Sequence, residues 1–247
     1  MAVKNYRLKI AYDGTRLYGW ERQPGKDTVQ GKLENVLSRM TGTEVEVTGA
    51  GRTDAGVHAR AMVANVQMDA KDMDCDGIRD YLNKYLSDDI AVTSVDECSD
   101  RFHARYNAKS RSYLYTIFDG PVKPVFNRKY YLRLDSPLDV ELMQEASKCL
   151  LGEHDFKSFC GNPKMKKSTV RNIEKLDIKR SKGYVYINIK GSGFLQHMVR
   201  IIVGTLIEVG YKRLESAKVQ EILEAKDRSL AGPTAEAKGL TFLSAEY

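Results

Sequence analysis

The chain opens with apolar residues at every second position. They are Tyr6, Leu8, Ile10 and Tyr12. A period of two residues is typical of a β-strand with one buried face. Between positions 29 and 40 the apolar spacing changes to three and four residues, which predicts a helix. Asp27 and Gln30 have the spacing of a helix start.

The same two periods predict the next four elements. They are strands at 45–47 and 62–68, a helix at 78–86 and a strand at 90–95. The order is then strand, helix, strand, strand, helix, strand. This order is that of the ferredoxin-like split arrangement, a mostly antiparallel sheet with helices on one face.

The rest of the chain roughly repeats this order, with one strand and one helix added. We expect strands at 111–118, 129–134, 170–178, 184–190 and 240–245, and helices at 142–150, 194–209 and 219–223. The predicted fold is therefore α+β, with two ferredoxin-like halves at residues 1–104 and 105–247 and a cleft where they meet.

Composition narrows the possible functions. A chain of 247 residues with 42% hydrophobic content can bury a sizeable core. Its apolar runs fall short of the roughly 20 residues that span a bilayer, and its start lacks a signal peptide's apolar block. We expect a cytoplasmic protein without a membrane segment. Lys and Arg exceed Asp and Glu by 39 to 33, which suits a polyanionic partner.

Cysteine and histidine spacing argues against metal or disulfide chemistry. The four cysteines form no CxxC pair and the four histidines no HExxH motif. We therefore expect no metal site and no catalytic cysteine.

The glycine-rich stretch GAGRTDAGVHA, at 49–59, is the strongest candidate for a catalytic loop. It places Asp54 two residues after Arg52 and four before His58. Aspartate alone is common in exposed turns. An arginine near a carboxylate favours its ionised form and fixes its orientation, which suits a nucleophile or a base.

Two further segments combine cations with apolar or aromatic residues. In RFHARYNAKSRSYLY, at 101–115, the mixture suits unpaired RNA, although strand tyrosines such as Tyr113 and Tyr115 are as often core residues. In GSGFLQHMVR, at 191–200, Arg200 lies on an otherwise apolar helix and needs an anionic partner. The better reading of His197 is structural.

Two connections are long for compact domains, at 13–26 and 153–169. The second contains a cationic run, NPKMKKSTVR. Its cations are Lys164, Lys166, Lys167 and Arg171. The sequence leaves two interpretations open, a patch that lies along phosphates and a solvated lysine loop.

Four motifs, in order, resemble those of the tRNA pseudouridine synthase A (TruA) family. They are YDGTRLYGWERQP, GAGRTDAGVHA, FHARYNAKSRSYLY and GSGFLQHMVRIIVGTLIEVG. The resemblance implies one extended sheet formed by both halves, a central positive cleft, and a homodimer that acts on tRNA. The implied substrates are uridines 38, 39 and 40 of the anticodon stem-loop, and no cofactor is implied.

The resemblance also implies roles for single residues. Asp54 matches the catalytic aspartate, Tyr113 the tyrosine that lies against the target base, and Arg200 the arginine that pairs with the aspartate. Arg52 matches an arginine implicated in RNA handling and base extrusion, and His58 completes the motif at the substrate site. Met62 stands near a position where relatives often have glutamine, which puts a polar contact there in doubt.

The chemistry of Asp54 has three possibilities at this stage. Its carboxylate could attack the sugar C1′, attack uracil C6 or remove the C2′ proton. Two other classes of protein also compete. A noncatalytic RNA-binding protein would explain the cations and tyrosines but not Asp54, and a metal-dependent nuclease would need clustered ligands.

Overall fold

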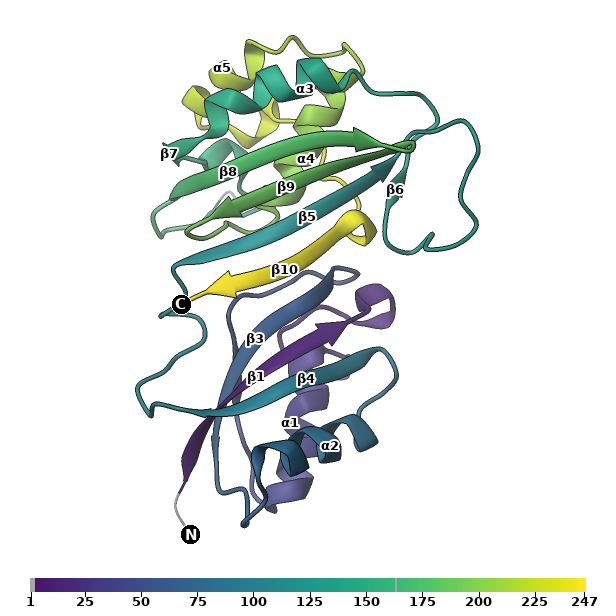
Figure 1. Cartoon of the computed structure of the whole chain (residues 1–247). Coiled ribbons are helices and arrows are strands. Elements are labelled where there is room, and N and C mark those ends of the chain that lie inside the picture. Colours follow the sequence, from purple (N-terminus) through teal and green to yellow (C-terminus); the bar gives the residue numbers. More distant parts are fainter. Residues whose placement is uncertain (1–2, 163) are drawn as a thin grey trace. The chain divides into compact units, whose positions relative to one another are not determined.

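A computed structural model describes residues 3–162 and 164–247 and divides the chain into two compact units (Figure 1). The first unit comprises the described residues up to Lys109 together with Phe242–Tyr247, and the second comprises Ser110–Thr241. Both units combine strands with helices, and the strands paired within each are antiparallel apart from one short parallel pair. The fold is α+β, as predicted.

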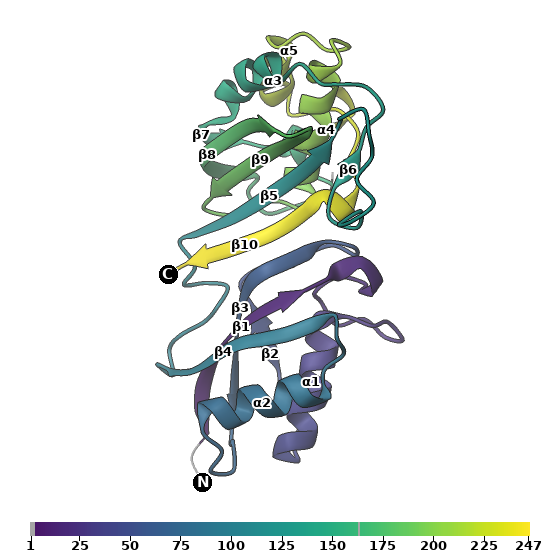
Figure 2. The same ribbon diagram turned by 45° about the vertical axis from the view of Figure 1, so that its right-hand side comes forward.

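The first unit contains the predicted order of strands and helices. Its elements are β1 (Lys4–Tyr12), α1 (Val29–Thr41), β2 (Val47–Gly49), β3 (His58–Met68), α2 (Cys75–Tyr85) and β4 (Ile90–Cys98). β1 lies between β4 and β3, and β2 pairs with β3. Both helices cover the same face of these strands (Figure 2).

The apolar residues that alternate with polar ones along β1 are buried, as expected for a strand with one buried face. Tyr6, Leu8, Ile10 and Tyr12 are all buried. Met62 of β3 pairs with Ile10 and is fully buried, so position 62 makes an apolar core contact. The predicted helix start is one residue off, because the N-cap of α1 is Thr28, whose side chain accepts a hydrogen bond from the Gly31 amide at 3.3 Å.

The second unit packs three helices together beside its strands (Figure 1). Its strands are β5 (Ser110–Phe118), β6 (Leu132–Arg133), β7 (Gly152–Asp155), β8 (Val170–Ser181) and β9 (Tyr184–Gly191), and β10 (Leu240–Glu246) begins in it. The order is β5, β9, β8, β7, with β6 parallel to β5. The helices are α3 (Val140–Ser147), α4 (Met198–Gly210) and α5 (Lys218–Ala225).

Of these three helices, α4 is the most apolar. Of its 13 residues only Arg200 and Glu208 are not buried. A membrane-spanning helix is not found in the part of the chain that the structure describes.

Two predicted elements are shorter than expected because the backbone leaves their period. The predicted strand at 129–134 is reduced to β6, two residues that follow a turn in which Asn127 has φ +59°. The helix predicted at 194–209 begins only at Met198, because His197 adopts the left-handed conformation with φ +59°. Hydrophobic spacing continues through both segments, so the sequence pattern alone does not reveal the turns.

The connection predicted at 153–169 is partly structured. It begins within β7, and Phe156, Phe159 and Cys160 are fully buried. These apolar side chains fix the first part of the connection to the unit. Lys164, Lys166 and Lys167 follow in the part without helix or strand, and Pro163 lies outside the described residues.

An ion pair between a buried carboxylate, that of Asp119, and the partly exposed Arg180 closes the loop 119–138, which we call the pocket loop. The Asp119 side chain is fully buried, and its carboxylate accepts hydrogen bonds from both terminal nitrogens of Arg180 at 2.6 and 2.8 Å. The same carboxylate accepts the Leu138 amide at 2.8 Å, and Arg180 donates to the Leu138 carbonyl at 2.6 Å. Both ends of the loop are therefore held by one bidentate pair.

Replacing Arg180 with alanine should lower the free energy of unfolding by about 2–4 kcal/mol, because it leaves the Asp119 carboxylate buried without its partner. Urea denaturation measures this change. Lys179→Ala is the matched control, since Lys179 is 71% exposed and its pair with Asp177 lies at the surface, so we expect a change within about 0.5 kcal/mol. Equal effects of the two substitutions would contradict the role of the Asp119 pair.

Candidate active site

The five candidate residues lie in both units. Arg52 and Asp54 occupy the loop between β2 and β3, and His58 is the first residue of β3. Tyr113 belongs to β5 and Arg200 to α4, both in the second unit. The first three residues therefore depend on the packing of one unit and the last two on that of the other.

The Asp54 loop is held by the segment 13–22, which precedes α1. The Thr53 carbonyl accepts the Trp20 amide at 3.0 Å, and the Gly56 amide donates to the Leu17 carbonyl at 3.3 Å. The hydroxyl groups of Tyr12 and Thr53 share a buried hydrogen bond of 2.8 Å. The residues on both sides of Asp54 are thus fixed to one neighbouring segment.

Glycines allow this close approach of two backbones. A Cβ atom on Gly14 would lie 2.0 Å from the Val57 carbonyl oxygen, and one on Gly19 would lie 2.5 Å from the Thr53 carbonyl oxygen. Gly19 also has φ +88°, a conformation that favours glycine. Both glycines of YDGTRLYGW, Gly14 and Gly19, are therefore required, because a larger residue at either position would prevent the segment from contacting the Asp54 loop.

His58 contributes to the same contact. Its side chain is 3% exposed, and its Nδ1 atom accepts the Gly14 amide at 3.0 Å. The geometry favours a positioning role for the imidazole, which ties the start of β3 to the segment 13–22. The sequence motif predicted only that His58 lies at the substrate site, without this supporting contact.

The segment 13–22 is in turn tied to α1. The amides of Val29 and Gln30 donate to the carbonyls of Gly19 and Trp20 at 3.1 and 3.0 Å. At the first turns of the helix, the backbone donors have no partner within the helix itself, so these bonds satisfy them. The buried side chain of Glu34 also contacts this segment, through Arg22 at 3.2 Å. Sequence reasoning missed Trp20 and Glu34, because neither residue type signals such a contact.

Asp54 and Arg52 differ in exposure. Asp54 is half-buried, and its backbone carbonyl accepts the Val57 amide at 3.1 Å, which closes a turn at Ala55 and Gly56. The Arg52 side chain is 59% exposed and forms an ion pair with Glu21. Asp54 thus stands in a fixed turn, whereas the Arg52 side chain is largely open to solvent.

The two tyrosines of β5 have different environments. Tyr115 is fully buried and donates its hydroxyl to the Glu236 carbonyl at 2.8 Å, and burial raises its pKa well above the usual value near 10. Its hydroxyl therefore stays protonated and bound to the backbone. Tyr113 is 8% exposed and meets Phe194 edge to face, with ring centroids 5.2 Å apart.

Arg200 is held on α4 by an adjacent segment of backbone. Its Nε atom donates to the Ala235 carbonyl at 2.7 Å, and its own carbonyl accepts the Ala235 amide at 3.1 Å. Gly204 permits the approach, since a Cβ there would lie 1.7 Å from the Pro233 carbonyl oxygen. These bonds fix the orientation of the half-buried Arg200 side chain relative to α4.

Metal binding has no support in the described part of the chain. Residues 3–162 and 164–247 contain no group of three or more His, Cys, Asp or Glu side chains that could hold an ion. What the Asp54 loop offers is a single carboxylate on a fixed turn.

Replacing Gly14 with alanine should displace the Asp54 loop, because the new methyl group would overlap the Val57 carbonyl. We expect a loss of about 1–3 kcal/mol in the free energy of unfolding and faster hydrogen exchange at the Trp20 and Gly56 amides. Gly193→Ala is the control, since a Cβ atom there would meet only the Arg171 side chain at 3.8 Å, an ordinary contact. If the Trp20 and Gly56 amides exchange at the wild-type rate in Gly14→Ala, the contact is not needed.

Comparison with known proteins adds independent evidence. A family model described as tRNA pseudouridine synthase matches residues 9–107 and 146–247. The chain is 46% identical to tRNA pseudouridine synthase A 2 of Bacillus cereus (strain ZK / E33L) over 246 residues, which cover 99% of this chain and 100% of the relative. It is 47% identical to tRNA pseudouridine synthase A of Bacillus sp. (strain KSM-64) over 239 residues, covering 96% and 97%.

A more distant relative agrees. The chain is 42% identical to tRNA pseudouridine synthase A 1 of Clostridium tetani (strain Massachusetts / E88) over 247 residues, covering 99% and 100%. The solved structure titled "Crystal Structure of a Cbf5-Nop10-Gar1 Complex" covers 96% of this chain and 57% of its own, but its TM-score of 0.37 is too low to bear on the fold. The sequence matches confirm the predicted resemblance. The chain therefore belongs to the tRNA pseudouridine synthase A family, whose activity is the isomerisation of uridine within tRNA.

Proposed function

We propose that the chain converts uridines 38, 39 and 40 of the tRNA anticodon stem-loop to pseudouridine, with the Asp54 carboxylate as the catalytic group. The observation that carries this proposal is the rigid support of Asp54. Residues on both sides of it bond to the segment 13–22, so the carboxylate meets a substrate from a fixed position. Catalytic groups gain most from such preorganisation.

The reaction needs no external reactant. The bond from uracil N1 to the sugar C1′ breaks, the base turns and C5 bonds to C1′, while C5 loses a proton and N1 gains one. A single ionised carboxylate can begin this sequence at C1′, at C6 or at the C2′ proton, and each route requires Asp54 next to the nucleoside. In this proposal Arg200 keeps that carboxylate ionised and oriented.

The other candidate residues act on the extruded nucleotide. A uridine in a stem must leave its stack, at a cost of a few kcal/mol, and needs a surface to receive it. Tyr113 provides that surface, since the hydroxyl of Tyr115 is already committed to Glu236. Arg52, more than half exposed, meets the RNA, and His58 supports the loop from behind.

The proposal extends to the assembly. Each unit would form one ferredoxin-like half, the two halves would share one extended sheet around a positive cleft, and the enzyme would act as a cytoplasmic homodimer. The order of elements in the first unit and the antiparallel pairing of β5, β9 and β8 in the second support this arrangement. A noncatalytic RNA-binding protein is the competing class, and a carboxylate that repels phosphate counts against it.

Substitution of Asp54 by asparagine should abolish conversion while tRNA affinity stays within about threefold, because it removes one charge and keeps the shape. The assay is tritium release from tRNA labelled at uracil C5, with a parallel binding measurement. Asp88→Asn is the matched control, an exposed aspartate of the same unit outside the loop, and it should retain full turnover. Turnover of Asp54→Asn within tenfold of wild type would refute the catalytic role.

Tyr113 should act through its ring. We expect Tyr113→Phe to keep the affinity for tRNA and Tyr113→Ala to weaken it about tenfold, since stacking on a base contributes about 1–3 kcal/mol. Tyr115→Phe is the control, because it removes the bond to Glu236 and lowers stability by about 1 kcal/mol without touching the base. Equal affinities of Tyr113→Phe and Tyr113→Ala would exclude stacking.

The target positions can be tested in cells. Chemical mapping of pseudouridine in tRNA from a strain that lacks the gene should show loss at positions 38, 39 and 40 only. Restoration by the wild-type chain and not by Asp54→Asn would tie the loss to this carboxylate. Unchanged modification at all three positions would refute the proposed substrate.

A further inference from the structure

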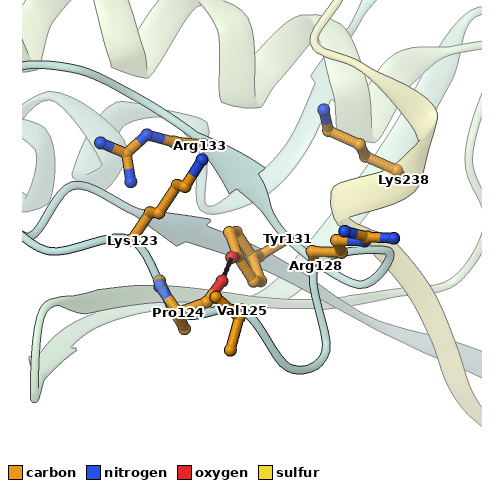
Figure 3. Close-up of a pocket in the computed structure, with 7 residues that line it drawn as sticks. All are labelled: Lys123, Pro124, Val125, Arg128, Tyr131, Arg133 and Lys238. Carbon is orange, nitrogen blue, oxygen red and sulfur yellow. Dashed lines mark hydrogen bonds between the residues drawn. The ribbon is translucent and has the colours of Figure 1, made fainter.

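A basic pocket lies in the second unit, formed by none of the five candidate residues of the active site. The pocket loop and the short helical turn Ala237–Gly239 form it, with a volume of about 210 Å³ (Figure 3). The Asp119–Arg180 pair holds the ends of the loop, and the Tyr131 hydroxyl donates to the Pro124 carbonyl at 2.7 Å across it. The pocket therefore stands on a braced frame.

Four cations line this pocket. Figure 3 shows Lys123 and Arg133 on one side of Tyr131, and Arg128 and Lys238 on the other. Within residues 3–162 and 164–247, neither Lys123 nor Arg128 takes part in an ion pair. Like charges that line one pocket repel each other, so their grouping favours an anionic ligand.

The two remaining cations are only partly neutralised. Lys238 pairs with Glu236 at 2.8 Å, and Arg133 lies 3.6 Å from Asp135, whose side chain is 95% exposed. The Asp119 carboxylate is already committed to Arg180. The carboxylates near the pocket thus neutralise only part of its positive charge.

Arg133 gives a second, independent sign of an anion site. Its Nη1 atom is buried and has no hydrogen-bond partner in the described part of the chain. A buried donor without an acceptor is uncommon and costs free energy. The Arg133 side chain is 34% exposed, so an oxyanion in the pocket would supply that acceptor once the guanidinium turns toward it.

The size of the pocket suits one group of a larger molecule. Sites for whole small molecules usually measure about 300–1,000 Å³, so 210 Å³ is below that range. A phosphate within a polynucleotide would fill the pocket while the chain continues past it. Arg and Lys are the side chains that most often neutralise RNA phosphates.

We propose that this pocket binds a backbone phosphate of the tRNA substrate, through Lys123, Arg128, Arg133 and Lys238. The inference rests on tRNA as substrate, but not on the catalytic role of Asp54. The pocket would fix the RNA on the second unit at a point separate from the target nucleotide. It would contribute to affinity rather than to the chemical step.

The tip of the pocket loop also exposes apolar side chains. Val122, Val125 and Phe126 are 80%, 66% and 81% exposed. A protein partner could cover them, but the centres of protein interfaces are depleted in lysine, and the unpaired Lys123 lies among them. RNA accommodates both features, since cations meet phosphates while an aromatic ring such as Phe126 stacks on a base.

The test uses the double variant Lys123→Gln/Arg128→Gln, which removes two cations that form no ion pair. We expect tRNA affinity to fall about three- to tenfold and the slope of log K against log salt to become shallower by up to about 1, since the pocket neutralises one phosphate charge and the variant removes two of its four cations. The kcat at saturating tRNA should stay within twofold. The matched control is Lys84→Gln/Lys148→Gln, which removes two exposed cations from helical segments and should change neither affinity nor slope.

Three outcomes would overturn the proposal. The first is a slope and affinity equal to those of the control variant. The second is a change in molecular mass by light scattering with an unchanged slope, which would show contact with a second copy. The third is tight binding of inorganic phosphate that tRNA does not displace, which would indicate a free anion as ligand. Loss of conversion in Asp54→Asn is measured separately, so the catalytic proposal and this one can fail independently.

Discussion

The position of the Asp54 loop depends on one contact, the approach of the backbone at Gly14 and Gly19 to the backbone at Thr53 and Val57. Side chains cannot fit in this contact, since any Cβ at either glycine would overlap a carbonyl oxygen. The Asp54 loop has no regular secondary structure of its own, and loops without such support are mobile. The segment 13–22 connects the loop to α1, because its carbonyls accept hydrogen bonds from the first amides of that helix. The helix thereby restricts the motion of the loop.

Much of this arrangement was predictable from the sequence, and the limits have physical causes. Alternating apolar positions predicted β1, because burial follows directly from side-chain period. The same period failed at His197 and Asn127, where a left-handed residue ends an element while the apolar spacing continues. Motif residues identified the Asp54 loop, but its supports could not be predicted. Tyr12, Trp20 and Glu34 are ordinary core or helix residues until the fold brings them to the loop or to the segment 13–22 that supports it.

The two tyrosines of β5 show why burial has to be known before roles are assigned. Both share one face of the strand, so sequence period cannot distinguish Tyr113 from Tyr115. In the folded chain, the Tyr115 hydroxyl satisfies the Glu236 carbonyl and its ring packs against Gly239. A buried hydroxyl bound in this way is costly to release. Tyr113, whose ring meets the edge of Phe194, is the better candidate to receive a base.

The same distinction applies to the cations, and it explains why net charge alone indicated little. A surplus of six positive charges is modest for a protein that binds RNA. What matters is which cations already have partners inside the protein. Arg180 is committed to Asp119 and Arg22 to Glu34, and these pairs stabilise the fold. Lys123 and Arg128 have no such partner in the described chain, yet a braced loop holds them in the same pocket as Arg133. Holding like charges together costs free energy in the absence of an anion, so this cluster is better explained by binding than by stability.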